Sequence, residues 1–272
     1  MVARELVTDR GTLRWLEAGE GRPLVLLHAF PLSGAMWLPQ LERPPHGWRL
    51  VAPDLRGFRR PDAPPADAPP TPWTMEDYAA DVEALVAALG ARDVALGGLS
   101  MGGYVAMALL RRGRVRPAAL LLADTRAEAD TEEARAGRRR LQGVAEREGS
   151  PGVAREMLPK LLGETTRARR PEIVAGVRTL IEANAPAALR AALEAMMGRP
   201  DSTDVLRRLD VPALIVVGEE DTVTPPETAE RLSRAVPDSR LVTVGGAGHL
   251  SNLENPEAFG AALEEFLVGC LA

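Results

Sequence analysis

Short apolar runs alternate with longer segments of helical periodicity through most of the chain. The runs of strand character are Glu5–Thr8, Thr12–Ala18, Pro23–His28, Arg49–Ala52, Val94–Gly97, Ala118–Ala123, Ala213–Val217 and Arg240–Val244. The first two are separated by the turn Asp9-Arg10-Gly11, which predicts a hairpin. The alternation predicts an α/β fold with a mainly parallel sheet covered on both faces.

Helical patterns occupy the segments between these runs. They begin near Met36 and continue at Thr74–Leu89, Met101–Arg112, Pro226–Ala235 and Asn252–Leu267. Thr74 is predicted to cap its helix, with Asp77 in the first turn complementing the helix dipole. Ser251 and Glu254 have the spacing of a capping box, which predicts that the final helix starts there.

The strand signal disappears between Thr125 and about Leu209. Apolar residues recur there at helical spacing, as at Leu189, Leu193 and Met196. Prolines break the segment into several helices, at Pro151, Pro171, Pro186 and Pro200. We therefore predict a helical cap at residues 125–209, inserted into an α/β core formed by residues 1–124 and 210–272.

Composition narrows the class of protein. The chain has 272 residues, of which 46% are hydrophobic and 26% charged, with a formal net charge of −5. The net charge argues against a nucleic-acid partner. The single cysteine, Cys270, excludes an internal disulfide. No secretory leader and no apolar run long enough for a bilayer are present, so a cytoplasmic protein without a membrane segment is expected.

Two arginine-rich runs stand out within the helical segment. They are Arg138–Arg140 and Arg167–Arg170. Because both lie in sequence of exposed helical character, they are interpreted as solvated helix faces.

The strongest chemical signal is Ser100, in the run Gly98-Leu99-Ser100-Met101-Gly102-Gly103 between a predicted strand and a predicted helix. A serine on so sharp a turn needs small neighbours, because the backbone packs closely on the sheet. The turn lifts the hydroxyl above the sheet, at the N-terminus of the helix. The setting predicts that Ser100 is a nucleophile.

A serine nucleophile needs a base, and the chain has three histidines. His46 lies in a proline-rich surface loop. His28 ends a strand and is interpreted as a structural imidazole that holds the following loop. His249 lies in a glycine-rich loop after the last strand, where it could reach over the strand ends, and is the predicted base.

The third group must be a carboxylate that orients the imidazole. Asp221 directly follows the strand Ala213–Val217 and is preferred, while Asp124 follows an earlier strand and is the competitor. Asp54 precedes the nucleophile and is expected to brace its local turn with Arg56. The order serine, aspartate, histidine is the one expected for an α/β-hydrolase.

The remaining site residues are predicted from position. An oxyanion hole needs two backbone N–H groups, which Met101 and Phe30 are expected to supply. Four apolar side chains are candidates for substrate contact, with core packing as the alternative for each: Trp37, Trp73, Met196 and Met197.

Taken together, the chain resembles the α/β-hydrolase superfamily over nearly its full length. The matching stretches are Leu26–Leu32, Ala52–Gly57, Gly98–Gly103, Leu121–Thr125, Val217–Asp221 and Gly246–His249. The resemblance is closest to small bacterial esterases, 3-oxoadipate enol-lactonase-like proteins and cofactor-free perhydrolase-like proteins. Two departures are Ala29, where a glycine is usual, and Gly57–Pro61, which replaces a glycine–aromatic–glycine–x–serine run. The resemblance implies an eight-stranded, mostly parallel sheet, a helical cap between its sixth and seventh strands, and no cofactor or metal.

The predicted activity is hydrolysis of carboxylic esters with small to medium acyl chains, through an acyl-enzyme on Ser100. The alternatives are hydrolysis of an enol-lactone, perhydrolysis with peroxide in place of water, and a non-catalytic ligand receptor. Receptors of this superfamily often lose a triad residue, whereas this chain keeps all three. A small ester or lactone is the expected partner, and the sequence leaves the oligomeric state open.

Overall fold

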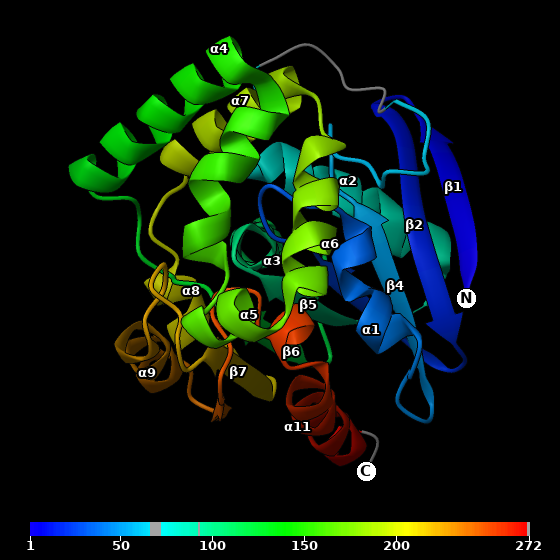
Figure 1. Cartoon of the computed structure of the whole chain (residues 1–272). Helices are drawn as coiled ribbons and strands as arrows, with labels where there is room; N and C mark the ends of the chain where they lie inside the picture. The colour runs from blue at the N-terminus through cyan, green and yellow to red at the C-terminus, as the bar shows by residue number, and fades with distance from the viewer. Residues whose placement is uncertain (66–71, 92, 271–272) are drawn as a thin grey trace.

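A computed structural model describes residues 1–65, 72–91 and 93–270 (Figure 1). Its strands form one eight-stranded sheet in the order β1-β2-β4-β3-β5-β6-β7-β8. The strands are β1 Val2–Thr8, β2 Gly11–Gly19, β3 Arg22–Leu27, β4 Trp48–Asp54, β5 Ala95–Leu99, β6 Leu120–Ala123, β7 Ala213–Gly218 and β8 Ser239–Val244. The predicted hairpin is present, since β1 pairs antiparallel with β2. The predicted eight-stranded, mostly parallel sheet is confirmed.

The direction of the strands decides where the loops gather. Strand β2 is antiparallel to both of its neighbours, whereas β4, β3, β5, β6, β7 and β8 pair in parallel. The carboxyl ends of parallel strands meet at one edge of a sheet, where α/β proteins place their ligands. The loops after β3, β5, β6, β7 and β8 therefore share one edge.

The central strands are fully buried, as expected for a sheet covered by helices on both faces. Every residue of β5, β6 and β7 is buried. In β3, Leu24 to Leu27 are each at most 1% exposed. Burial of one such leucine side chain contributes roughly 1.5–3 kcal/mol, so this run anchors the middle of the sheet.

The helices largely follow the predicted pattern. They are α1 Leu38–Leu41, α2 Met75–Leu89, α3 Met101–Arg112, α4 Glu132–Leu161, α5 Glu164–Arg169, α6 Pro171–Glu182, α7 Pro186–Met197, α8 Thr203–Arg207, α9 Pro226–Ala235, α10 Ser251–Glu254 and α11 Pro256–Gly269. The predicted cap of α2 is confirmed, because the Thr74 side chain accepts from the Asp77 N–H and Asp77 bonds back. Among the described residues, no helix has the length and apolar character needed to cross a membrane.

The predicted start of the final helix is wrong. It is two helices, because Asn255 leaves the helical conformation at φ −141° and its side chain caps α11. The Ser251 hydroxyl does not cap a helix; it donates to Asp124. Glu254 accepts backbone N–H groups from a loop instead of completing a capping box. Local spacing could not reveal these distant partners.

Helices α4 to α8 lie between β6 and β7, inside the segment predicted to form the cap. Figure 1 shows α4, α6 and α7 lying side by side, and α4 contacts both of the others. Gly149 has a positive φ of 68° and divides α4 into two stretches. Treating residues 125–209 as a distinct cap remains our proposal.

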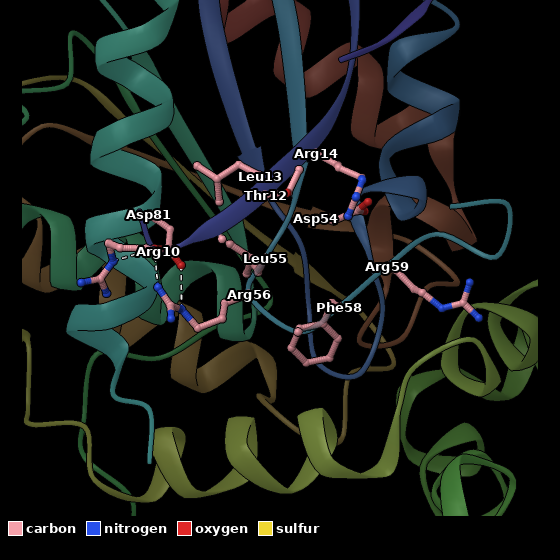
Figure 2. Close-up of a pocket in the computed structure, with 12 residues that line it drawn as sticks. Arg10, Thr12, Leu13, Arg14, Asp54, Leu55, Arg56, Phe58, Arg59 and Asp81 are labelled. Carbon is pink, nitrogen blue, oxygen red and sulfur yellow. Dashed lines mark hydrogen bonds and ion pairs between the residues drawn. The ribbon is translucent and has the colours of Figure 1, made fainter. Parts of the chain in front are cut away.

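An ion-pair network holds the first residues after β4, as far as Arg60 (Figure 2). The Arg56 Nε donates to Asp81 on α2 at 2.7 Å, and the Arg10 Nε donates to the same carboxylate at 3.1 Å. Asp54 instead pairs with Arg60 at 2.9 Å and accepts from the Gly34 N–H. The predicted Asp54–Arg56 brace is therefore wrong. Arg56 instead pairs with Asp81, 25 residues later in the sequence, a contact that local sequence patterns do not predict.

Candidate active site

Ser100 lies on a strained turn between β5 and α3. Its backbone has φ 53° and ψ −112°, a conformation that side-chain-bearing residues rarely adopt. A Cβ on Gly98 would lie 2.3 Å from the Gly102 backbone, and one on Gly102 would lie 2.1 Å from the Leu27 carbonyl oxygen. Only glycine fits at these two positions. The glycines therefore let the turn sit tightly on the sheet while Ser100 stands above it.

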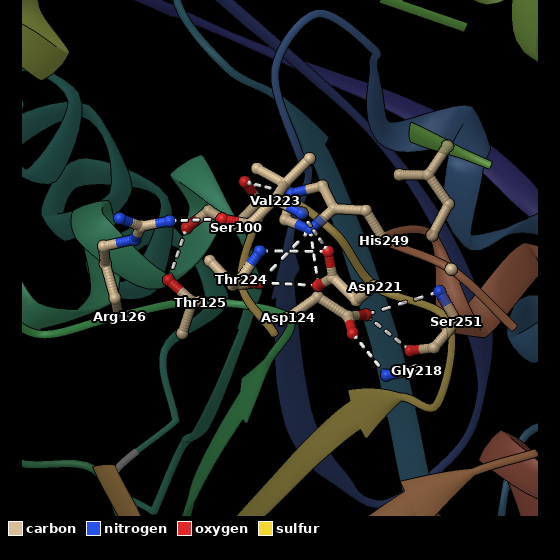
Figure 3. Close-up of polar contacts among 12 residues, drawn as sticks. Ser100, Asp124, Thr125, Arg126, Gly218, Asp221, Val223, Thr224, His249 and Ser251 are labelled. Carbon is tan, nitrogen blue, oxygen red and sulfur yellow. Dashed lines mark hydrogen bonds and ion pairs between the residues drawn. The ribbon is translucent and has the colours of Figure 1, made fainter. Parts of the chain in front are cut away.

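The turn brings Ser100 together with two residues that are distant in sequence. The Ser100 Oγ lies 2.8 Å from the His249 Nε2, and the His249 Nδ1 lies 2.8 Å from the Asp221 Oδ2 (Figure 3). These are hydrogen-bond distances. The structure thus joins the three residues that the sequence singles out into one continuous chain.

Asp221 is held rigidly in place by its own turn. Its Oδ1 accepts from the N–H groups of Val223 and Thr224, at 2.7 and 3.0 Å, and its Oδ2 accepts from the Thr224 hydroxyl at 2.6 Å. Burial raises the pKa of Asp221, but the charge of His249 and the hydrogen bonds from His249 and Thr224 outweigh burial, so the net shift is downward from 3.8. Asp221 is therefore a carboxylate facing the imidazole.

His249 is 1% exposed, and its loop is held by Glu254. One Glu254 oxygen accepts from the N–H groups of Gly248 and Leu250, and the other accepts from the Gly163 N–H. Burial lowers the pKa of His249, but the Asp221 charge and hydrogen bond raise it more, so the net shift is upward from 6.5. Sequence reasoning missed the role of Glu254, whose partners lie outside its helix.

Asp124, the competing acid, has a different set of partners. Its Oδ1 accepts from the Gly218 N–H at 2.8 Å, and its Oδ2 accepts from the Ser251 hydroxyl at 2.5 Å. It therefore ties the end of β7 to the segment that follows His249 (Figure 3). Burial, together with the Asp221 charge, raises the pKa of Asp124 to about 8. The two neighbouring carboxyl groups therefore differ in their partners, because Asp221 faces His249 whereas Asp124 faces Gly218 and Ser251.

Two backbone N–H groups are available beside Ser100. Met101 is the first residue of α3, where helix N–H groups have no partner within the helix. Phe30 lines the same cavity as Ser100. Among the described residues, neither N–H donates a hydrogen bond within the protein. Both predicted oxyanion donors thus lack a partner within the described residues, and their role as an oxyanion hole stays a prediction.

His28 braces the loop that carries Phe30, in agreement with its predicted structural role. Its Nε2 accepts from the Leu55 N–H at 3.0 Å, and its Nδ1 donates to the Ala29 carbonyl at 2.9 Å. Burial lowers the pKa of His28 to about 4, which keeps the ring neutral. His46 is exposed on the surface.

A model of the alpha/beta hydrolase family matches residues 24–262. The chain belongs to this family. Among solved structures, a thermophilic esterase from Thermogutta terrifontis, determined with malate bound, is 39% identical over the whole of both chains, with a TM-score of 0.92. The enol-lactonase from Burkholderia xenovorans is 26% identical, covering 97% of this chain and 100% of its own, with a TM-score of 0.87. A pimeloyl-[acyl-carrier protein] methyl ester esterase from Neisseria meningitidis is 29% identical over 92% of this chain and 94% of its own.

Beside Ser100 and His249 the hydrolase has a cavity of about 250 Å³. It lies between the core and the helices α4 and α7. Its apolar lining includes Phe30, Leu141, Val144, Met157, Leu161, Leu193, Met196 and Val223. Within the described residues, no group of three or more histidine, cysteine, aspartate or glutamate side chains is arranged to hold a metal ion.

The four apolar candidates for substrate contact are placed differently. Met196 lies in the cavity lining, but Trp37, Trp73 and Met197 are outside the lining formed by the described residues. Trp37 packs against Phe259, with ring centroids 5.9 Å apart, and Trp73 packs against Tyr78 at 6.1 Å. The two tryptophans therefore pack in the hydrophobic core, which is the alternative to substrate contact.

The interpretation of both arginine-rich runs as solvated faces is wrong in part. Arg138 and Arg140 line the cavity, and Arg138 donates to the buried Asp130 at 2.6 Å. In the second run, Arg170 donates to the Glu254 carbonyl. The signal overlooked was that Arg138 and Leu141 share a helix face, because residues three apart are neighbours.

Proposed function

We propose that this hydrolase cleaves carboxylic esters, with Ser100 as nucleophile, His249 as general base and Asp221 as the group that orients His249. The observation that carries the proposal is the unbroken chain of hydrogen bonds from the Asp221 Oδ2 through His249 to the Ser100 Oγ, beside a cavity. The full-length likeness to the Thermogutta esterase supports ester chemistry.

The geometry supplies each proton transfer. The Ser100 Oγ attacks the ester carbonyl carbon while its proton passes to the His249 Nε2, 2.8 Å away. The tetrahedral intermediate collapses when His249 returns the proton to the leaving alcohol oxygen, leaving Ser100 acylated. A water molecule that gives a proton to His249 then attacks the acyl carbon, and His249 returns that proton to the Ser100 Oγ as the acid is released.

Electrostatics stabilise the charges that form on the way. The N–H groups of Phe30 and Met101 would donate to the carbonyl oxygen as it becomes negative, and loss of one such donor costs roughly 2.7–4 kcal/mol in comparable enzymes. Asp221 stabilises the imidazolium and fixes the tautomer whose Nε2 accepts the proton. The unpartnered N–H groups of Phe30 and Met101 support the first role, and the hydrogen bonds that hold Asp221 in place support the second.

Lactone hydrolysis would use the same three groups on a cyclic ester. Perhydrolysis would use them with peroxide in place of water. A panel of p-nitrophenyl esters, run beside an enol-lactone and with and without peroxide, separates these reactions. We expect the linear esters to give the highest kcat/KM. A preference for the enol-lactone, or an activity that requires peroxide, would contradict the proposal.

The small cavity predicts a limit on acyl-chain length. A site of about 250 Å³ lined by α4 and α7 leaves long chains partly unburied, which forfeits about 0.8 kcal/mol for each methylene. We expect p-nitrophenyl esters from acetate to hexanoate to exceed the palmitate ester by about a hundredfold or more in kcat/KM. Fastest turnover on palmitate, with activation at a lipid interface, would contradict this.

The proposal also predicts the acid limb of the pH profile. Only neutral His249 can accept the serine proton, and its pKa is raised above 6.5 mainly by Asp221, against the effect of burial. The inactive, protonated form therefore persists to higher pH, and kcat/KM should rise through a pKa above 6.5. Asp221→Asn should move that midpoint to lower pH. A wild-type midpoint below 6.5, or an unmoved midpoint in the variant, would contradict the assignment.

A further inference from the structure

The cavity beside Ser100 carries an excess of positive charge. Its lining contains four basic side chains and two acidic ones: Arg126, Arg138, Arg140 and Lys160 against Asp130 and Glu156. Asp130 contacts both Arg138 and the neighbouring Arg199, each at 2.6 Å. One carboxylate is therefore shared by two guanidinium groups. With Glu156 as the second acidic group, five basic side chains, Arg199 included, stand against two carboxylates, so the cluster keeps an excess of positive charge.

Among the basic residues of the lining, Arg126 is next to Thr125, which contacts the Ser100 turn. It follows Thr125, whose hydroxyl donates to the Ser100 carbonyl at 2.8 Å. Figure 3 shows the Arg126 side chain extending toward the same region as Ser100 and Val223. The charge of Arg126 lowers the pKa of His249, so the two groups are in electrostatic range.

The hydrogen-bonding capacity of Arg126 is only partly used. Its Nη2 donates to the Val223 carbonyl, while its Nε is buried and has no hydrogen-bond partner. In the part of the chain that the structure describes, no carboxylate lies within ion-pair distance of Arg126, Arg140 or Lys160. Arg126 therefore contributes a guanidinium to the cavity lining that has no carboxylate partner among the described residues.

The rest of the lining restricts what such a cation can bind. The apolar side chains of α4 and α7 suit a hydrocarbon, and a guanidinium matches the two oxygens of a carboxylate. Arg140 and Lys160 are exposed and lie at the outer part of the lining. They are placed to attract an anion from solution, with an effect that salt should screen.

We propose that the preferred substrates are esters that also carry a carboxylate, and that Arg126 binds this second group. The inference rests on the proposed ester hydrolysis and narrows its substrate class. Arg126 thereby becomes a specificity-determining residue, one that sequence reasoning did not single out.

The test compares pairs of substrates that are matched in size and differ chiefly in the charge of one end group. Mono-p-nitrophenyl adipate carries a terminal carboxylate, and methyl p-nitrophenyl adipate is its neutral counterpart. We expect wild-type enzyme to prefer the charged ester by about tenfold or more in kcat/KM, mainly through KM. A second pair, p-carboxyphenyl butyrate and p-acetylphenyl butyrate, places the charge on the alcohol side and shows which part of the ester Arg126 contacts.

Three variants complete the experiment. Arg126→Gln keeps a donor for the Val223 carbonyl but removes the charge, and should reduce the charged-to-neutral ratio by about ten- to a hundredfold. Arg126→Lys should restore part of that ratio. Arg114→Gln, whose side chain is 74% exposed and outside the cavity lining, should leave the ratio unchanged.

The outcomes separate this inference from the function on which it rests. Equal kcat/KM for charged and neutral esters in both pairs, or an unchanged ratio in folded Arg126→Gln, would overturn the role of Arg126 while leaving ester hydrolysis in place. Failure of wild-type enzyme to hydrolyse any of the four esters would instead overturn the proposed function.

Discussion

Replacing Ser100 with alanine is expected to lower kcat/KM for p-nitrophenyl butyrate by roughly four to six orders of magnitude. The Oγ is the only atom removed, and it is the atom that lies 2.8 Å from the His249 Nε2. His249→Ala should cause a loss of similar size, because nucleophile and base act as one unit. The double variant should be little worse than either single one.

Ser233→Ala is a matched control for the loss of a serine hydroxyl. Ser233 lies on α9, and its hydroxyl bonds with Ser239, away from the active-site cavity. Activity should be unchanged in this variant, and circular dichroism should show native structure in all of them. Folded Ser100→Ala that retained a tenth of wild-type activity would exclude Ser100 as the nucleophile.

The second large effect is expected at Asp221. Asp221→Asn should leave KM nearly unchanged and reduce kcat by roughly ten-thousandfold, the size of the same change in a serine protease. The amide can still lie beside the His249 Nδ1, but it favours the wrong tautomer and cannot stabilise the imidazolium. The remaining bonds from Val223 and Thr224 should keep the turn folded.

Asp124→Asn is the informative comparison, because both acids are buried and both follow a strand at the same sheet edge. Asp124 bonds to Gly218 and Ser251. Its replacement should therefore lower the free energy of unfolding by about 1–3 kcal/mol, with a far smaller change in kcat than Asp221→Asn causes. Urea unfolding and steady-state kinetics measure the two effects. A crippled Asp124→Asn beside a near-normal Asp221→Asn would reassign the acid, although Ser100 and His249 would stand.

The sequence predicts most of the framework and the three candidate catalytic residues that the structure brings together. The apolar runs identify all eight strands because the buried parallel strands are almost continuously apolar, as in Leu24–Leu27. Ser100 is recognisable because its turn requires glycine at fixed positions, where a Cβ would collide with backbone. Asp221 and His249 follow from their places after late strands of a parallel sheet.

What the sequence does not predict are contacts between distant segments. Arg56 pairs with Asp81 on α2, and Glu254 holds a loop that includes Gly163, 91 residues away. The partners in such pairs depend on how the insert and the loops pack. The predicted exposure of Arg138 is wrong for the same reason, because Asp130 and the cavity determine which way its helix face turns.

The central claim is that an acyl group passes through Ser100, and peptide mass spectrometry of enzyme quenched during turnover of p-nitrophenyl butyrate tests it most directly. The account predicts a butyryl ester on the peptide that contains Ser100, present in wild-type enzyme and absent from Ser100→Ala. A butyryl group on a different residue, or hydrolysis that continues in Ser100→Ala without any acylated peptide, would contradict it.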